Sequence, residues 1–404
     1  MSATLASPPA QRGPAPKARP GVPPISAGGR GDHLAPRRDG QGDGEPPNPP
    51  PTGVRRSGSV PRGPAGSAPA GETGPRGGGG RPCVLVLRAL GLGDLLAGVP
   101  ALRGLRRAFP AHEVVLAAPG GLREAVAAVD AVDRLFPAEA PARGVPSLRA
   151  WTEAPPDVAV DLHGNGPASR DALAALRPGR LLAFAGPHAP GEPQPRWRPD
   201  EHERARWCRL LEVYGIAADP ADLRLPPPAE PSPAPGAVVV HPGANAAARR
   251  WPAERYAAVV AELRASGRDV VISGGPGDEE QVADLAARTG VPVHQNLPYQ
   301  RFAALIAHAS ALLSADTGPA HLAVAYATPS VTLFGPVAPA LWGPPPDARH
   351  LALHHPSPPA DPNAPTPDPT LLRITPNEVT TALTTLPPPT PAPHPPPPTS
   401  QTGT

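Results

Sequence analysis

The chain has 404 residues, of which 69 are Pro and 42 are Gly, while aromatic residues make up only 3%. Pro and Gly together form about a quarter of the chain, against roughly 12% in average proteins, and this excludes a compact fold from end to end. The net charge of +2 gives no argument for a nucleic-acid partner or an anionic membrane.

The excess of Pro and Gly lies at the two ends of the chain. Residues 1–80 have almost no apolar periodicity, and 387–404 are nearly all Pro, Thr and small polar residues, so both are predicted to be disordered tails. The N-terminus lacks an apolar signal region, and the cysteines Cys83 and Cys208 fit a reducing compartment. The sequence therefore predicts a cytoplasmic protein with a folded part at 81–386 and at most peripheral membrane contact.

Strands and helices alternate in the predicted N-terminal domain, residues 81–224. The buried apolar run Cys83–Leu87 predicts a strand, and apolar residues recur at helical spacing from Leu95 to Leu105. Further strands are expected at 114–118, 158–162 and 181–184, and further helices at 122–129, 170–176 and 201–214.

A Pro-rich segment, 225–235, predicts a stiff linker, and the pattern then restarts in the C-terminal domain, 236–386. Strands are expected at 237–241, 269–273, 311–315 and 330–334, and helices at 254–266, 279–289, 301–309 and 320–326. A capping box at Thr375–Glu378 predicts a terminal helix after an irregular stretch, 343–370. Two βαβ halves predict an α/β fold of two Rossmann-like domains, with ligands at the carboxyl ends of the strands.

The first candidate site follows the first strand, where Gly91-Leu-Gly93-Asp94 leads into a helix. Glycines allow the backbone to approach a ligand, and Asp94 would lie at the mouth of the cleft. An aspartate here is also a common helix cap, so both interpretations stay open. The spacing is not that of G-x-G-x-x-G, which leaves a dinucleotide site with little support.

Two further motifs lie between a strand and a helix in the second half. His241-Pro-Gly243 leads to the pair Arg249-Arg250, which either binds phosphate or stacks with Trp251 on the surface.

The other motif is Asp316-Thr317-Gly318-Pro319-Ala-His321. The free amides and the dipole of the helix that begins here suit an anionic diphosphate. Asp-Thr-Gly also occurs in aspartic proteases, but these require a β-rich setting rather than the amphipathic helix expected here. No metal-binding spacing accompanies the histidines, so neither a metal nor another cofactor is predicted.

In combination, these motifs resemble glycosyltransferase family nine, whose best-known members are the ADP-heptose:lipopolysaccharide heptosyltransferases. The resemblance runs from residue 83 to 386 and preserves the order and approximate spacing of the motifs. It implies a GT-B architecture of two domains facing a cleft. It also implies an N-terminal acceptor domain, a C-terminal donor domain, and inversion at the anomeric carbon without an obligatory metal.

The resemblance also implies roles for individual residues. Asp94 matches the general base that is proposed for the family. Arg249 stands where the family commonly has Lys; it keeps the positive charge but cannot give up a proton. The donor-binding residues are then Gly243, Arg249, Arg250, Asp316, Thr317, Gly318, Pro319 and His321, and the acceptor-side residues are Gly93, Asp161 and His163.

The expected function is transfer of a heptose or related sugar from a nucleoside diphosphate, ADP above all, to a hydroxyl of a cell-surface glycan or glycolipid. The partners are this donor and acceptor, with the tails as candidate protein-binding segments. A non-catalytic sugar-nucleotide-binding or scaffold protein is the alternative, and a phosphorylase or epimerase is a third possibility. Asp94 separates the first two, since only an enzyme requires an ionisable base there.

Overall fold

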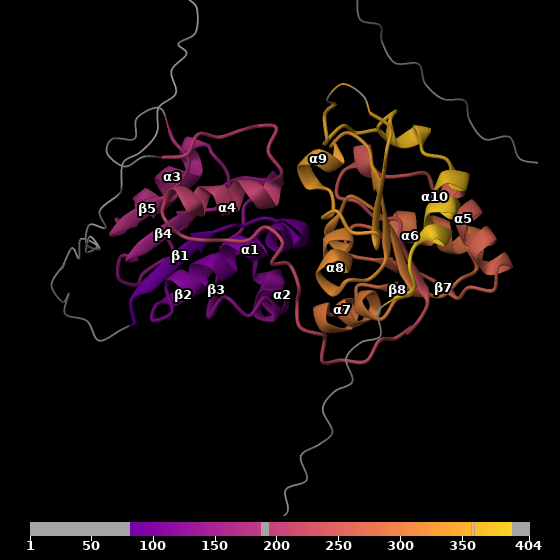
Figure 1. Ribbon diagram of the computed structural model, residues 1–404, viewed down its shortest axis with the longest axis horizontal. Helices are drawn as coiled ribbons and strands as arrows, with labels where there is room; N and C mark the ends of the chain where they lie inside the picture. Colours follow the sequence, from indigo (N-terminus) through magenta and orange to yellow (C-terminus); the bar gives the residue numbers. More distant parts are fainter. Residues whose placement is uncertain (1–80, 187–193, 357, 359, 390–404) are drawn as a thin grey trace, which may run out of the picture. The chain divides into compact units, whose positions relative to one another are not determined.

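The structure is a computed structural model that describes residues 81–186, 194–356, 358 and 360–389 (Figure 1). Most of the two predicted tails, residues 1–80 and 390–404, therefore lies outside the described residues. All of the described residues belong to one compact unit. Among the described residues, no helix is both long and apolar enough to cross a membrane.

The first half is built on a five-stranded parallel sheet in the order β3-β2-β1-β4-β5. Its strands are β1 Cys83–Leu87, β2 Glu113–Ala118, β3 Arg134–Pro137, β4 Val158–Asp161 and β5 Arg180–Leu182. Its helices are α1 Leu92–Ala108, α2 Arg123–Ala128, α3 Pro167–Ala174 and α4 Glu203–Val213. Both faces of β1 are buried, because Val84 and Val86 pack with α1 and α4, and Leu85 and Leu87 pack on the side of α3.

The second half repeats this plan with a six-stranded parallel sheet in the order β11-β10-β9-β6-β7-β8. Its strands are β6 Val238–His241, β7 Val270–Gly274, β8 Val293–Gln295, β9 Ala311–Ala315, β10 Ser330–Phe334 and β11 His350–His354. Its helices are α5 Ala253–Ala265, α6 Glu279–Thr289, α7 Tyr299–Ala307, α8 Gly318–Tyr326, α9 Pro339–Trp342 and α10 Pro376–Thr385.

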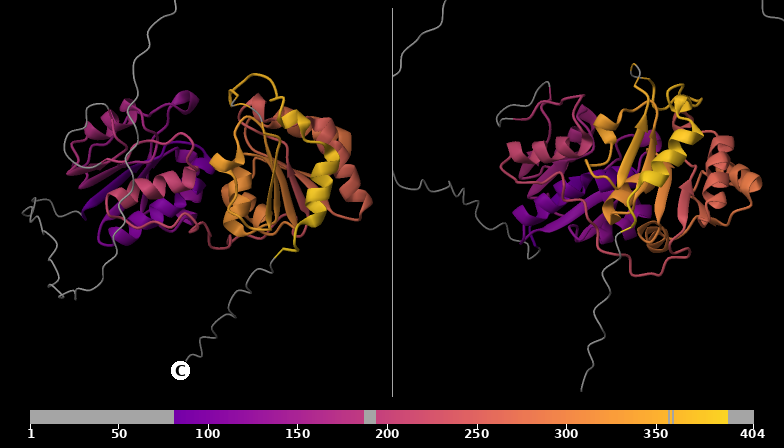
Figure 2. Two further views of the ribbon diagram at one scale, coloured as in Figure 1. Left: turned by 45° about the horizontal axis from the view of Figure 1, so that its top comes forward. Right: turned by 45° about the vertical axis from the view of Figure 1, so that its right-hand side comes forward.

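Helices cover both faces of the second sheet, with α7 and α8 on one face and α5, α6 and α10 on the other (Figure 2). Both sheets have the strand order of the Rossmann fold, in which the chain reverses direction across the sheet beside the first strand. The predicted α/β fold with two Rossmann-like halves is confirmed. The predicted domain boundaries at 224/225 and 235/236 stay predictions.

The prediction of an irregular stretch at 343–370 is wrong, because β11 (His350–His354) lies within it and pairs with β10 in parallel register. This strand lies at the edge of the sheet, and its side chains are only partly buried after His350. A short, partly buried strand surrounded by prolines lacks the continuous apolar run that identified the central strands. The same reason applies to β3 and β8, which were also missed.

Candidate active site

The candidate site lies at the carboxyl ends of the central strands of the two sheets. In the first half, the segments after β1 and β4 carry Asp94 and His163; in the second half, the segments after β6 and β9 carry Gly243 and Asp316. These strands flank the point at which the strand order reverses, where open parallel sheets bind their ligands.

Asp94 lies in the first turn of α1 and is only 5% exposed. Its carboxylate accepts a hydrogen bond from the amide of Gly91 at 3.1 Å, which closes the helix start, and another from the Arg143 guanidinium at 2.8 Å. Burial opposes the ionised form, but the positive charges of Arg88 and Arg143 outweigh it and lower the pKa of Asp94 below its usual range. Asp94 is therefore both a helix cap and a buried, ionised carboxylate.

Arg88 holds the segment around Asp94 in place. Its guanidinium is 1% exposed and donates to the carbonyl oxygens of Asp94 and Leu162 and, at 3.1 Å, to the carboxylate of Glu203. It also lies over the ring of Trp207, 5.1 Å from the ring centroid. One buried cation thus joins the start of α1, the end of β4 and the first turn of α4.

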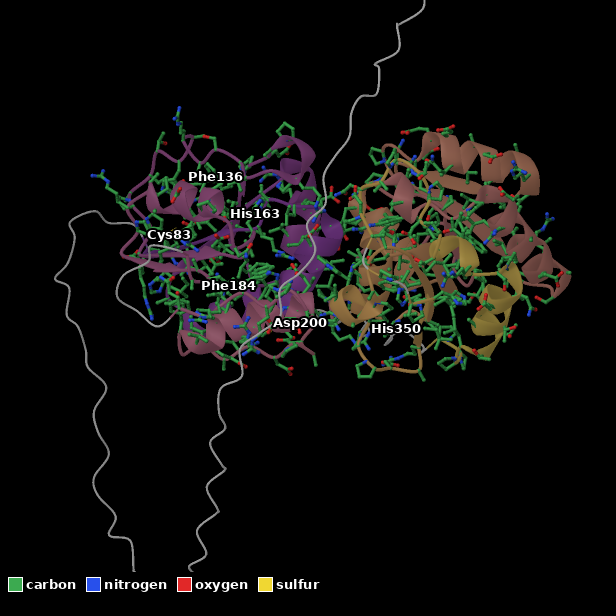
Figure 3. The ribbon with its side chains drawn as sticks, turned by 90° about the horizontal axis from the view of Figure 1, so that it is seen from above. Cys83, Phe136, His163, Phe184, Asp200 and His350 are labelled. Atoms are coloured by element: carbon green, nitrogen blue, oxygen red, sulfur yellow. The ribbon has the colours of Figure 1, made fainter. Side chains whose placement is uncertain are left out.

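Asp161 and His163 organise the turn after β4. The Asp161 carboxylate accepts hydrogen bonds from the amide of His163 at 3.0 Å and from the hydroxyl of Ser169 at 2.6 Å, and burial raises its pKa. Nδ1 of His163 accepts a hydrogen bond from the amide of Ala89, so this histidine fixes the segment that leads to Asp94 (Figure 3 shows it within the first half). The Asp161 carboxylate is thus used within its own turn, whereas His163 remains partly exposed.

The predicted donor segment forms the start of α8. Thr317 is the N-cap, Gly318 and Pro319 begin the helix, and the Asp316 carboxylate is 6% exposed in front of it. Burial raises the pKa of Asp316 to about 6, with Arg249 opposing this effect and Asp94 adding to it. His321 lies 3.7 Å from Asp316, but burial lowers the pKa of His321 to about 4, so the imidazole is neutral at pH 7 and the contact is not an ion pair.

Two glycines allow the starts of α1 and α8 to meet. A Cβ atom on Gly93 would lie 2.9 Å from the ring of His321, and one on Gly318 would lie 3.2 Å from the side chain of Leu92. Contacts this short require displacement of the neighbouring group. Glycine at both positions therefore brings Asp94 of α1 close to the Asp316–His321 segment.

Arg249 and Arg250 lie close together but face different partners. Arg249 approaches Asp316, donating to its carbonyl oxygen at 3.3 Å and lying 3.6 Å from its carboxylate, while its Nε atom is buried without a hydrogen-bond partner. Arg250 donates to the carbonyl oxygen of Ala244 and so stabilises its own loop. Only Arg249 thus points toward the start of α8 with a free donor.

A buried polar chain lies beneath the loop that contains Gly243. His241 contacts the Ser273 hydroxyl through Nδ1 at 3.0 Å and approaches the Asp278 carboxylate through Nε2 at 3.4 Å. A Cβ atom on Gly243 would lie 2.1 Å from the Asp278 carboxyl carbon. Gly243 is therefore required for the loop to pass over this carboxylate.

Three cationic or imidazole side chains near the site were missed as site residues by the sequence analysis. Arg143 contacts Asp94, and both His202 and Arg204 donate at 3.0 Å to the carbonyl oxygen of Gly343, which follows α9. The arginines resemble any surface arginine in the sequence, because their partners lie far away in the chain. His202 is the N-cap of α4, whereas the predicted helix start at 201 placed it inside the helix.

Within the described part of the chain, no group of three His, Cys, Asp or Glu side chains could hold a metal ion. A cavity of about 340 Å³ lies away from Asp94 and Asp316, lined by Arg264, Arg268 and Asp269. It borders the residues at which β6 and β7 begin, whereas ligands of parallel sheets bind at the carboxyl ends. We therefore place the candidate site at Asp94 and Asp316.

Comparison with known proteins shows similarity to one family. Residues 192–360 match the family model of glycosyltransferase family 9 (heptosyltransferase). Lipopolysaccharide heptosyltransferase 3 of Escherichia coli is 32% identical over 114 residues, which are 26% of this chain and 33% of that protein. This chain thus spans about a third of the length of that curated relative.

Solved structures show the same fold over most of the chain. The glycosyl transferase family 9 protein from Veillonella parvula DSM 2008 has a TM-score of 0.61 at 19% identity and covers 75% of this chain and 96% of its own. The E. coli ADP-heptose lps heptosyltransferase II has a TM-score of 0.58 at 19% identity and covers 74% and 97%. The family-model match thus confirms the resemblance inferred from the motifs over residues 192–360, and the solved structures show the shared fold.

Proposed function

We propose that the chain is a glycosyltransferase, because residues 192–360 match the model of glycosyltransferase family 9. It transfers a heptose or related sugar from a nucleoside diphosphate to a hydroxyl group of a cell-surface glycan or glycolipid. The observation that supports this most is the meeting of two helix starts, with Asp94 on one side and Arg249 and Asp316 on the other. ADP is the expected nucleotide, since a structural relative is named for ADP-heptose.

The proposed reaction is a single displacement at the anomeric carbon. The acceptor oxygen attacks this carbon, its proton passes to Asp94, and the bond from the sugar to the diphosphate oxygen breaks, so that the configuration inverts. The lowered pKa of Asp94 keeps its carboxylate ionised and able to accept this proton. Arg143 is 54% exposed and is the partner of Asp94 that an incoming acceptor can displace.

The leaving diphosphate is assigned to the start of α8 and to Arg249. The amides at this helix start and its dipole attract an anion, and Arg249 adds a fixed positive charge beside it. Charge on the diphosphate grows as the sugar departs, so these groups stabilise the transition state more than the bound donor.

Two substitutions at opposite ends of the reacting system test this proposal. Asp94→Asn keeps the size of the side chain but removes its basicity, so donor binding should persist while turnover falls by roughly 10²- to 10⁴-fold. Arg249→Ala should weaken binding of the donor diphosphate and also slow turnover, and Arg249→Lys should restore part of both.

Calorimetric titration with ADP and steady-state rates with ADP-heptose measure these effects. Near-normal turnover in Asp94→Asn would reduce Asp94 to a helix cap and favour a non-catalytic binding protein. Unchanged ADP affinity in Arg249→Ala would remove its phosphate role. If no nucleoside diphosphate in a panel binds the wild-type protein, the proposed function itself is wrong.

A further inference from the structure

Arg204 is a buried cation without a carboxylate partner. It lies in the first turn of α4 and is 8% exposed, and its guanidinium donates to the carbonyl oxygen of Gly343 at 3.0 Å. No aspartate or glutamate of the described residues forms an ion pair with it. In contrast, the two other arginines of α4 are paired, Arg206 with Glu203 and Arg209 with Glu201.

An unpaired buried charge is unfavourable in the free protein. A carbonyl oxygen satisfies one donor of the guanidinium but does not neutralise it, and burial lowers the pKa of Arg204 to about 10. The side chain nevertheless stays charged at pH 7. Charges are rarely buried in this way unless a counter-ion is supplied, and residues that destabilise the free protein are concentrated at functional sites.

The surroundings of Arg204 show which kind of counter-ion fits. Arg204 lies near the start of α8, because it binds the carbonyl oxygen of Gly343, and the neighbours of Gly343, Trp342 and Pro344, line one small cavity with Asp316 and His321. The ring of Trp342 also packs edge-on against that of His321, with 5.8 Å between the ring centroids. Arg249 contacts Asp316 from the second half, and the positive charges of both arginines act to lower the pKa of His321. Arg204 belongs to the first half of the chain and Arg249 to the second. Arg249 also retains a buried Nε donor without a partner.

We propose that Arg204 binds the diphosphate of the donor nucleotide from the N-terminal half, opposite Arg249. This inference rests on the proposed function and adds a residue from the other half to the donor site. Two guanidinium groups near one helix start, each from a different half of the chain, match the two phosphates of a nucleoside diphosphate, since each can form charge-assisted hydrogen bonds. Donor binding then also links the start of α4 to the start of α8.

The substitution Arg204→Met tests this, because it removes the charge and keeps an unbranched side chain. The melting temperature of the ligand-free variant should equal or exceed that of the wild type, since a buried unpaired charge is lost. Its affinity for ADP should fall about 10-fold or more, as expected for loss of a charge-assisted contact, while its affinity for adenosine should not change. Substitution of a purely structural residue would lower the melting temperature, so an unchanged or higher melting temperature together with weaker ADP binding is not expected of one.

Arg255→Met is the matched control. Arg255 lies on α5 and, like Arg204, donates to backbone carbonyl oxygens, those of Leu372 and Ile374. Its substitution should lower the melting temperature and leave the affinity for ADP unchanged. Arg204→Lys is a second variant. It keeps the positive charge but loses the planar guanidinium that can form two parallel hydrogen bonds to a phosphate, so it should bind ADP with intermediate affinity.

Several results would overturn the proposal. One is an ADP affinity within about twofold of the wild type in both Arg204 variants; another is an equal loss of adenosine and ADP affinity. A raised KM for the acceptor with unchanged ADP affinity would assign Arg204 to an anionic acceptor instead. In each case wild-type binding and transfer persist, which distinguishes this failure from failure of the proposed function.

Discussion

The buried pair Asp316 and His321 makes stability depend on pH in two opposite ways. The folded-state pKa of Asp316 is raised from 3.8 to about 6, so its contribution to stability is fully present below pH 3.8 and is lost as the pH rises through 6. The folded-state pKa of His321 is lowered from 6.5 to about 4, so its contribution is present above pH 6.5 and is lost as the pH falls toward 4.

The two effects are similar in size and nearly cancel in the wild-type protein. A pKa shift of this size corresponds to about 3 kcal/mol of unfolding free energy, of which about 2 kcal/mol falls between pH 4.5 and 7.5. A substitution of either residue should therefore make the unfolding free energy depend on pH. Asp316→Asn leaves only the His321 effect, so the free energy of unfolding should rise by about 2 kcal/mol, relative to the wild type, from pH 4.5 to 7.5. In His321→Gln only the Asp316 effect remains, so the free energy of unfolding relative to the wild type should fall by about the same amount over this pH range.

Urea unfolding of the full chain at several pH values measures these differences. Asp284→Asn serves as the control, because Asp284 forms an exposed pair with Arg288 on α6 and should stay within about 0.5 kcal/mol of the wild type. The electrostatic reasoning would be refuted if the difference in unfolding free energy between each variant and the wild type did not change with pH. It would also be refuted if this difference changed in the same direction for both variants.

Three further predictions concern the site. Transfer should keep its rate in excess chelator, because the diphosphate is assigned to arginine and helix amides; loss of activity that magnesium or manganese restores would contradict this. Arg143→Gln should raise the pKa of Asp94, since Arg143 lowers it, and the acidic limb of the kcat/KM profile should move to higher pH; an unmoved limb would mean that Arg143 does not act on the reacting carboxylate. Gly243→Ala should lower the unfolding free energy by about 1–3 kcal/mol through the clash with Asp278, as measured by urea unfolding, and an unchanged midpoint would show that the loop can shift.

The sequence predicted those features that depend on neighbouring residues. Continuous apolar runs identified the central strands, such as β1 and β9, and turn residues located the helix starts that carry Asp94 and Asp316. Edge strands were missed where partial burial leaves a weaker apolar pattern, as in β11.

Side-chain partners distant in the chain could not be predicted. Arg204 contacts Gly343, and Arg143 contacts Asp94, through folding that no local pattern encodes. The adjacent pair Arg249 and Arg250 illustrates the same limit, because only the fold shows that one faces Asp316 and the other its own loop.

The bond between Arg88 and Glu203 has a consequence for how the protein is made. All five strands of the first sheet leave the ribosome before Glu203 does, yet Arg88, which directly follows the central strand β1, is buried beside this carboxylate. Until Glu203 has been synthesised, a closed sheet would bury the Arg88 guanidinium without its ion-pair partner, which is unfavourable. The nascent chain is therefore expected to delay burial of Arg88, and the first half to complete its fold only when α4 emerges.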